Sequence, residues 1–349
     1  MKPEHLKFDP HKMRYTGIIG TGGIGSGKFF ALNGNHTLGR EESRSGHFMD
    51  VRDYCKQHII LHYIITLLGP SFSVIPIGRL GDDDIGNILF DEMKRDGFDM
   101  KWIEKVPEVS TLFSFCFFYP DGSGGNLTTD DSASTLVDAA YIEKAIADIR
   151  QLGSEGIIMA APEVPLEARK RLLELGKRHG LFCSASFTTG EMKQAMESGI
   201  LKYVDLLSVN LDEAAEAAGI QTEKTGAEII VRSSIEKLKS HNSCIRAAIT
   251  SGKQGSWCWD GHRLNRFPAV ITTAVSTAGA GDAFISGLLC GLALGLHLFE
   301  AQQLASLVAG LSVTSPHTIN KDIDRRSLNT FLHSSGMIFS ESVIKLLEE

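Results

Sequence analysis

A short segment of small residues that ends in an acid is the strongest chemical signal in this sequence. Residues 276–282 read STAGAGD and lie between a strand-like run, 269–275, and a long apolar helix. At a helix N-terminus, small residues let backbone N–H groups approach an anion, and the helix dipole adds positive potential. Asp282 could there take a proton from an attacking hydroxyl while the N–H groups hold the developing charge. The alternative is a tight turn in which Asp282 only caps the helix.

A second pair of polar residues follows a hydrophobic run at 205–209. Asn210 ends this run, and Glu213 stands in the first turn of an expected helix. Open α/β sheets bind ligands at the carboxyl ends of their strands, and these two side chains could hold Mg²⁺ through water and so orient a nucleotide. A helix-capping box fits the same spacing equally well.

A third segment, residues 247–255, reads AAITSGKQG. Thr250, Gly252 and Gly255 follow a strand-like run, so a hydroxyl and bare backbone stand at the end of a strand. Such a loop can wrap a phosphate, and it can equally be a plain hairpin.

The elements that position these residues alternate along most of the chain. Short β-branched apolar runs and helical patterns follow one another, which is typical of βαβ units and a parallel sheet. We expect strands at 15–19, 73–77, 156–160, 181–184, 205–209 and 245–250. We expect helices at 59–68, 82–94, 165–178, 212–218, 228–239 and 283–298, and more helices after residue 321. The glycines of helix 283–298 are expected to let it lie close against the sheet.

Residues 101–136 break this alternation. A strand-like run at 111–119 leads into a turn and a glycine-rich loop, with no helix of its own. We expect this segment and residues 28–50 to form a small β-sheet lid within a single domain of residues 1–349.

These motifs, in this order, resemble the PfkB or ribokinase-like family of carbohydrate and nucleoside kinases. Residues 276–282 are similar to the family's D-T-x-G-A-G-D signature, 210–213 to its N-x-x-E motif, and 250–255 to its T-x-G-x-x-G nucleotide loop. Residues 78–86 (GRLGDDDIG) are similar to its G-x-x-G-x-D-x-x-G motif. The resemblance covers roughly residues 70–320.

The resemblance implies a Rossmann-like three-layer α/β/α fold with a mostly parallel sheet and a β-sheet lid. It implies an ATP- and Mg²⁺-dependent kinase for a small polar substrate, with a sugar favoured over a nucleoside. Asp282 would be the catalytic base. The remaining implied residues are Gly279, Ala280 and Gly281 for the anion hole, Asn210 and Glu213 for magnesium and phosphate, and Thr250, Gly252 and Gly255 for the nucleotide.

Two parts of the chain depart from the family pattern. Ser276 replaces an aspartate that in many members helps to hold a monovalent cation, which puts that cation in doubt. Residues 45–50 (SGHFMD) stand in for the family's G-G-x-x-x-N segment, and this alignment gives Gly46 and Asp50 to the substrate site. The Ser276 replacement also keeps open a non-catalytic relative that binds a sugar or nucleotide.

The glycine-rich segment after the first strand has two other interpretations. Residues 22–29 (GGIGSGKF) almost spell a Walker A loop, but Phe29 replaces the hydroxyl residue that binds magnesium. Gly20, Gly22 and Gly25 approach a dinucleotide fingerprint, the only support for an oxidoreductase, but no clear helix follows. We interpret the segment as a glycine turn beside the substrate pocket.

His58 and His62 share one face of an expected helix and form half of a metal site. No third ligand is apparent in register, so we interpret them as core or surface histidines.

The composition indicates which binding partners and which cellular compartment to expect. The 35 Lys and Arg residues against 42 Asp and Glu give a net charge of −7, and no basic block indicates a nucleic-acid partner. The six cysteines are scattered, which favours a reducing cytoplasm. No apolar run is long enough for a membrane span. A homodimer through the lid stays open.

Overall fold

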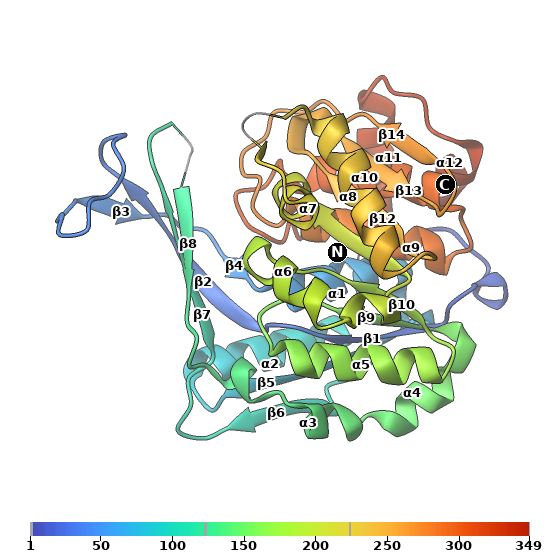
Figure 1. Ribbon diagram of the computed structural model, residues 1–349, viewed down its shortest axis with the longest axis horizontal. Coiled ribbons are helices and arrows are strands. Elements are labelled where there is room, and N and C mark those ends of the chain that lie inside the picture. Colours follow the sequence, from blue (N-terminus) through green and yellow to red (C-terminus); the bar gives the residue numbers. More distant parts are fainter. Residues whose placement is uncertain (1–2, 122–123, 223–224, 349) are drawn as a thin grey trace.

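The centre of the fold is a nine-stranded sheet (Figure 1). The computed structural model describes residues 3–121, 124–222 and 225–348. The strand order is β14-β13-β12-β11-β10-β9-β1-β5-β6. The strands are β1 (Gly17–Thr21), β5 (Ser73–Gly81), β6 (Trp102–Val106), β9 (Gly156–Ala160), β10 (Phe182–Ala185), β11 (Leu206–Asn210), β12 (Arg246–Thr250), β13 (Ser256–Trp259) and β14 (Leu264–Phe267). All pairings from β6 to β12 are parallel, and β13 and β14 add an antiparallel edge.

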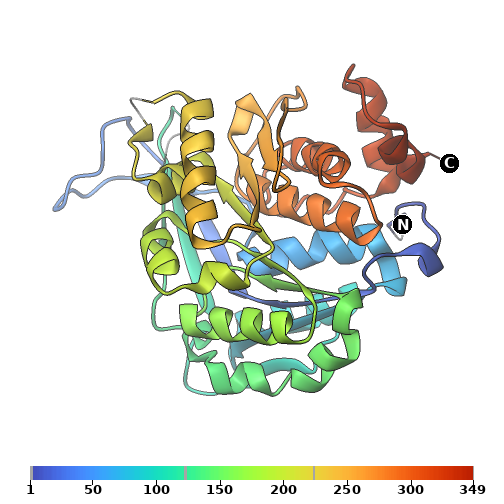
Figure 2. The same cartoon turned by 45° about the vertical axis from the view of Figure 1, so that its right-hand side comes forward.

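Helices cover both faces of this sheet, as Figures 1 and 2 show. Ile18 and Ile19 are neighbours on β1, yet they belong to two separate buried clusters because successive strand residues point to opposite faces. The cluster with Ile18 includes residues of α1 (Lys56–Leu68), α2 (Asp84–Asp96), α9 (Ala280–Ala293), α10 (Leu298–Ser312), α11 (Arg325–Ser334) and α12 (Glu341–Leu347). The cluster with Ile19 includes residues of α3 (Ala139–Glu143), α4 (Ile146–Leu152), α5 (Leu166–Arg178), α6 (Thr189–Glu197), α7 (Leu211–Ala218) and α8 (Ala227–His241). The predicted three-layer α/β fold is confirmed.

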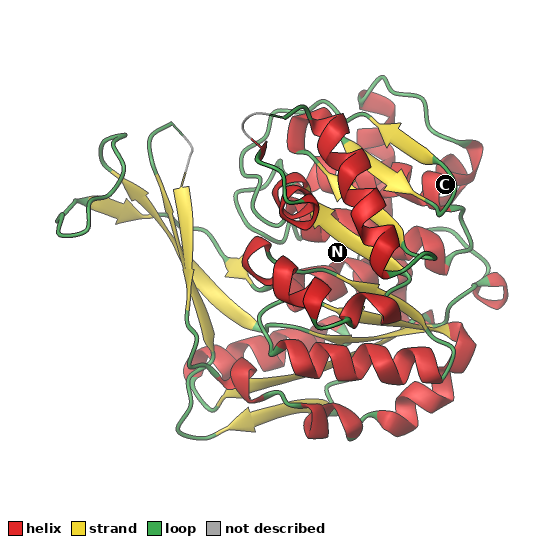
Figure 3. Ribbon diagram, in the orientation of Figure 1, coloured by secondary structure: helices red, strands yellow, loops and turns green. Residues whose placement is uncertain are grey.

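A second, smaller sheet projects from the main body (Figures 1 and 3). Its order is β3-β2-β7-β8, and β4 pairs with β2. The strands are β2 (Gly25–Leu32), β3 (Gly46–Phe48), β4 (Asp53–Tyr54), β7 (Leu112–Phe118) and β8 (Gly124–Thr128). The predicted lid boundaries, 28–50 and 101–136, overlap this sheet but are wrong at one edge. Residues 102–106 form β6, which pairs with β5 in the main sheet and buries Ile103 there.

The glycine-rich segment after β1 leads into a strand. Strand β2 begins at Gly25, so no helix follows these glycines along the chain, and neither a Walker A loop nor a dinucleotide turn forms. Gly25 and Gly27 are needed for close packing. A Cβ at Gly25 would lie 2.2 Å from the Leu112 carbonyl oxygen, and one at Gly27 would lie 2.2 Å from Asp53 Oδ2.

Two further expectations were wrong. Residues 269–275 form no strand, because β14 ends before Pro268 and the chain turns into a loop. The glycines of α9 lie against α10 and not against the sheet, since a Cβ at Gly287 or Gly291 would lie 2.8 Å from an atom of Ala305 or Ala301. Within the described ranges, every helix is too short or too polar to cross a membrane.

Candidate active site

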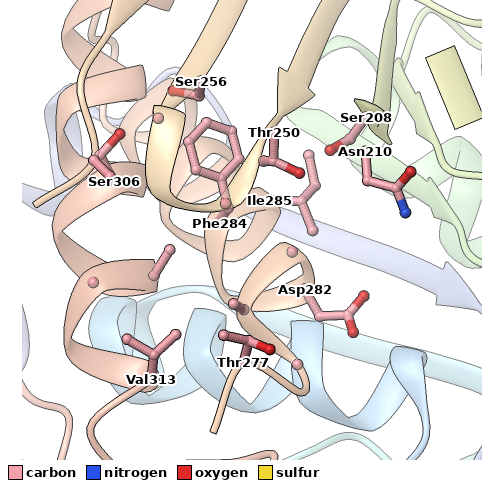
Figure 4. A pocket seen from close by; sticks show the side chains of 18 of the residues that line it. Ser208, Asn210, Thr250, Ser256, Thr277, Asp282, Phe284, Ile285, Ser306 and Val313 are labelled. Carbon is pink, nitrogen blue, oxygen red and sulfur yellow. The ribbon is translucent and has the colours of Figure 1, made fainter. Parts of the chain in front are cut away.

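A cavity of about 440 Å³ lies where β11 and β12 end and α9 begins. Figure 4 shows Asn210 and Thr250 at the two strand ends and Asp282 at the start of α9. The structure brings together on this cavity all nine residues that the resemblance gave to catalysis and nucleotide binding. They are Asn210, Glu213, Thr250, Gly252, Gly255, Gly279, Ala280, Gly281 and Asp282. Segments far apart in the sequence therefore meet at the carboxyl edge of the sheet, where such folds bind ligands.

Asp282 is paired with a lysine that sequence reasoning missed. The side chain of Asp282 is only 15% exposed, and its Oδ2 lies 3.9 Å from Nζ of Lys56, the first residue of α1. Burial raises the pKa of Asp282, and the Lys56 ammonium group partly offsets this effect. Asp282 in turn raises the pKa of Lys56, so this lysine stays charged. The Lys56 ammonium group therefore lies beside a largely buried carboxyl group and favours its ionised form.

Backbone geometry at the start of α9 matches an anion hole. Gly279 is the N-cap of the helix with φ 78°, a conformation that favours glycine, and a Cβ there would lie 2.6 Å from the Thr318 carbonyl oxygen. The N–H of Ala280 donates to the Thr277 carbonyl oxygen at 3.2 Å. The Ala280 N–H is therefore already engaged, and Gly279 and Gly281 are the better candidates among the three predicted donors.

Asn210 and Glu213 form a reciprocal capping box at the start of α7. The Glu213 N–H donates to Asn210 Oδ1 at 2.9 Å, and the Asn210 N–H donates to Glu213 Oε2 at 2.8 Å. The capping interpretation is thus correct, and both side chains also line the cavity. Burial raises the pKa of Glu213 to about 7. A cation bound nearby would favour its ionised form.

The far end of the cavity has the character of a nucleotide site. Gly252 and Gly255 have φ 48° and 91°, so the loop after Thr250 depends on glycine at both positions. The loop before α9 and one side of α10 complete the wall with small and apolar residues. They are Ala269, Val270, Thr272, Ala274, Ser306, Ala309, Gly310 and Val313.

Two more buried acids lie near Asp282, and the sequence gave no motif for either. Glu163 follows β9 and accepts a hydrogen bond from the Lys56 N–H at 3.2 Å through Oε2. Burial raises its pKa to about 7, against the attraction of Lys56 and with smaller contributions from Asp282 and Asp53. Its φ of 75° is strained for a residue other than glycine. Its place just after a strand end was the signal that could have identified it.

Asp53 lies on β4, only 6% exposed, and accepts a hydrogen bond from the Ser114 hydroxyl of β7. Burial raises its pKa, and repulsion from Asp282 adds to the effect. Asp53 therefore connects the lid sheet to the charged end of the cavity.

The two predicted substrate residues lie elsewhere. Gly46 and Asp50 are on or beside lid strand β3 and do not line the cavity. Gly46 has a packing role, because a Cβ there would lie 2.2 Å from the Ala31 carbonyl oxygen of β2. Asp50 is exposed. Ser276 accepts a hydrogen bond from the Ala278 N–H through Oγ at 3.3 Å, a turn contact next to the anion hole.

Comparison with known proteins agrees with this geometry. A model of the pfkB family of carbohydrate kinases matches residues 63–325. The chain belongs to this family. It is 23% identical over 238 residues to a ribokinase of Schizosaccharomyces pombe, which covers 68% of this chain and 72% of the relative. The protein is therefore a phosphotransferase of the carbohydrate kinase type, and the family implies ATP as the phosphoryl donor.

Solved pfkB-like structures share the fold. An Arabidopsis thaliana ribokinase complexed with ribose and ATP aligns with TM-score 0.69 at 17% identity, over 96% of this chain and 99% of that one. A Burkholderia thailandensis nucleoside kinase in complex with inosine aligns with TM-score 0.71 at 15% identity, over 93% and 100%. The fold alone therefore does not distinguish a sugar from a nucleoside as substrate.

Proposed function

We propose that this pfkB kinase transfers the γ-phosphoryl group of ATP to a hydroxyl of an uncharged sugar, with Asp282 as the general base. The observation that carries the proposal is the pairing of Asp282 with Lys56 at the start of α9, on the same cavity as the nucleotide loop. A carboxylate that only capped the helix would not need a lysine beside it.

Asp282 and the residues around it have separate roles in the reaction. The sugar hydroxyl donates its proton to the Asp282 carboxylate as its oxygen attacks the γ-phosphorus, and the bond to the β-γ bridging oxygen breaks. The N–H groups of Gly279 and Gly281 and the Lys56 ammonium group hold the charge on the transferred phosphoryl group. The loop of Thr250, Gly252 and Gly255 positions the nucleotide.

Magnesium fits the opposite wall of the cavity. Asn210 and Glu213 would hold it through water, since one Glu213 oxygen caps the helix and the other is free of that bond. When bound, the ion neutralises charge on the phosphates. Closure of the lid sheet over the substrate would exclude water from the reacting groups.

The acids near Asp282 favour an uncharged substrate. Asp282 lies close enough to Asp53 and Glu163 to raise the pKa of both, so a sugar phosphate would bring another negative charge into an acidic site. Sugar hydroxyls, in contrast, can donate hydrogen bonds to these carboxylates. Asp53 replaces Asp50 in our assignment of the substrate-binding acid.

A substrate panel tests the proposal. ATP consumption by the purified full chain is measured with neutral sugars, sugar phosphates and nucleosides, and the Asp282→Asn variant supplies the background. We expect the highest kcat/KM with a neutral sugar. Preferred turnover of a sugar phosphate contradicts the argument from the acidic residues around Asp282. Preferred turnover of a nucleoside would make this protein a nucleoside kinase. No turnover above background with any acceptor supports a binding-only relative.

A homodimer through the lid and a cytoplasmic location stay predictions. Phe48 on β3 and Leu127 on β8 are each 63% exposed, which gives the lid an apolar surface for a second copy. Light scattering of the purified chain measures the mass directly.

A further inference from the structure

Three potential metal ligands from α1 and the end of α2 lie close together, outside the active-site cavity. His58 and His62 lie one turn apart on α1, and Asp96 ends the adjacent α2. One ligand atom from each residue lies within 4.8 Å of the other two. His62 Nδ1 is 3.1 Å from Asp96 Oδ2, which is close to the separation of adjacent ligands around one zinc ion. The structure therefore supplies the third ligand that the sequence did not show.

His58 has an unused nitrogen that faces the interior. The residue is 1% exposed, and its Nδ1 has no hydrogen-bond partner within the described part of the chain. A buried polar atom without a partner is costly, so it calls for a ligand or another explanation. The imidazole of His58 is a type of ligand that transition metals commonly take in proteins. The Tyr54 and Phe98 rings pack edge-on against it at 4.8 and 6.0 Å.

Of the two carboxylates near these histidines, that of Asp96 can balance the charge of a metal cation. Glu92 accepts hydrogen bonds from the Tyr54 hydroxyl and from Lys321, and this ion pair neutralises Glu92. Within residues 3–121, 124–222 and 225–348, the ion pair of Asp96 is with His62. The Lys321 ammonium group also acts on this cluster, and its side chain is 44% exposed, so it can move toward solvent.

We propose that His58, His62 and Asp96 form a binding site for a first-row transition metal ion such as Zn²⁺, separate from the magnesium site at the nucleotide. Two imidazoles and one carboxylate suit zinc, whereas Mg²⁺ prefers oxygen ligands alone. Ligands of one zinc ion lie roughly 3.4 Å apart in tetrahedral geometry, so small side-chain adjustments from the observed spread of 4.8 Å close the set. Water completes the coordination.

The ion would tie the start of α1 to the end of α2. Lys56, which contacts Asp282, lies two residues before His58 on α1, and Tyr54 of lid strand β4 packs on the His58 ring. Metal occupancy is thus expected to stabilise the fold around the active site without entering the reaction.

The test is metal binding by the full chain after treatment with a chelator. Zn²⁺ is titrated against a chromophoric competitor, and Co²⁺ is added separately to read its visible absorption. We expect one ion per chain, a four-coordinate Co²⁺ spectrum, and an increase in Tm with Zn²⁺. His62→Gln and Asp96→Asn are expected to weaken binding at least about 10-fold. His241→Gln, which removes an exposed histidine on α8, is the matched control and should bind like the wild type.

Either of two results overturns the proposal. One is a wild-type chain that binds no stoichiometric Zn²⁺ or Co²⁺, which needs no variant to fold. The other is wild-type affinity in both His62→Gln and Asp96→Asn, which assigns the ion to other residues. A Zn²⁺-dependent increase in Tm that persists in both variants leads to the same conclusion.

Discussion

Replacing Lys56 by methionine should move the pH dependence of catalysis upward. The substitution keeps the aliphatic chain but removes the cation that lies 3.9 Å from Asp282. Coulomb's law with an effective dielectric constant of about 20 gives about 4 kcal/mol at this distance. Because Lys56 is 34% exposed, water screens part of this energy, and about 1 to 2 kcal/mol is a realistic remainder. Each 1.36 kcal/mol corresponds to about one pH unit.

The sign follows from the role of Asp282. Lys56 favours the ionised carboxylate, so its loss raises the pKa of Asp282. A general base must be deprotonated, and the acidic limb of kcat/KM against pH is therefore expected to shift up by about one unit. The assay is ATP consumption across pH with the best acceptor from the panel. Lys253→Met is the matched control, since Lys253 lines the same cavity without contacting Asp282.

An acidic limb that stays in place in Lys56→Met would refute this reasoning. It would mean either that Asp282 is not the titrating base or that the pair does not persist in solution. An equal shift in Lys253→Met would point to a general effect of net charge.

Three further predictions concern neighbouring residues. Glu213→Gln keeps the capping box, because glutamine can also accept the hydrogen bond from the Asn210 N–H. The substitution should weaken magnesium-dependent turnover more than it weakens sugar binding. An unchanged magnesium dependence would mean that Asn210 and Glu213 only cap the helix. Potassium should activate weakly or not at all, since Ser276 offers a neutral hydroxyl, and strong stimulation would show that this argument about Ser276 is wrong. Burial raises the pKa of Glu163 from 4.5 to about 7, so the folded protein loses stability as the pH rises between these two values. The free energy of unfolding of Glu163→Gln should therefore exceed that of the wild type by about 3 kcal/mol at pH 8 and should equal it near pH 4, and a gain that is equal at both pH values would contradict this.

Local patterns in the sequence were enough to predict six of the nine strands of the main sheet, and the family resemblance supplied the nine predicted residues that line the cavity. The strand at 156–160 was predicted at its observed bounds, because an apolar β-branched run buried on both faces has no strong alternative. The motifs at Asn210, Thr250 and Asp282 could be assigned because each directly follows a strand or begins a helix. Because the strands are parallel, these positions then lie together at the carboxyl edge of the sheet.

The missed residues depend on contacts between distant segments. Lys56 and Glu163 are 107 positions apart, yet they share a hydrogen bond, and neither has a motif around it. Asp53 was overlooked because Asp50, three residues earlier, fitted the family pattern better, and only pairing of β4 with β2 decides which acid is buried. The strand expected at 269–275 failed because apolar residues there line a cavity and not a sheet.

Turnover of Asp282→Asn tests the central claim most directly. Asparagine has nearly the same shape as aspartate, and Gly279 remains the N-cap of α9, so the fold should remain intact while the proton acceptor is lost. We predict a fall in kcat of about 10² to 10⁴ with ATP affinity and Tm close to the wild-type values. A folded Asp282→Asn variant with near-normal kcat would contradict the account, because the base would then have to be another residue.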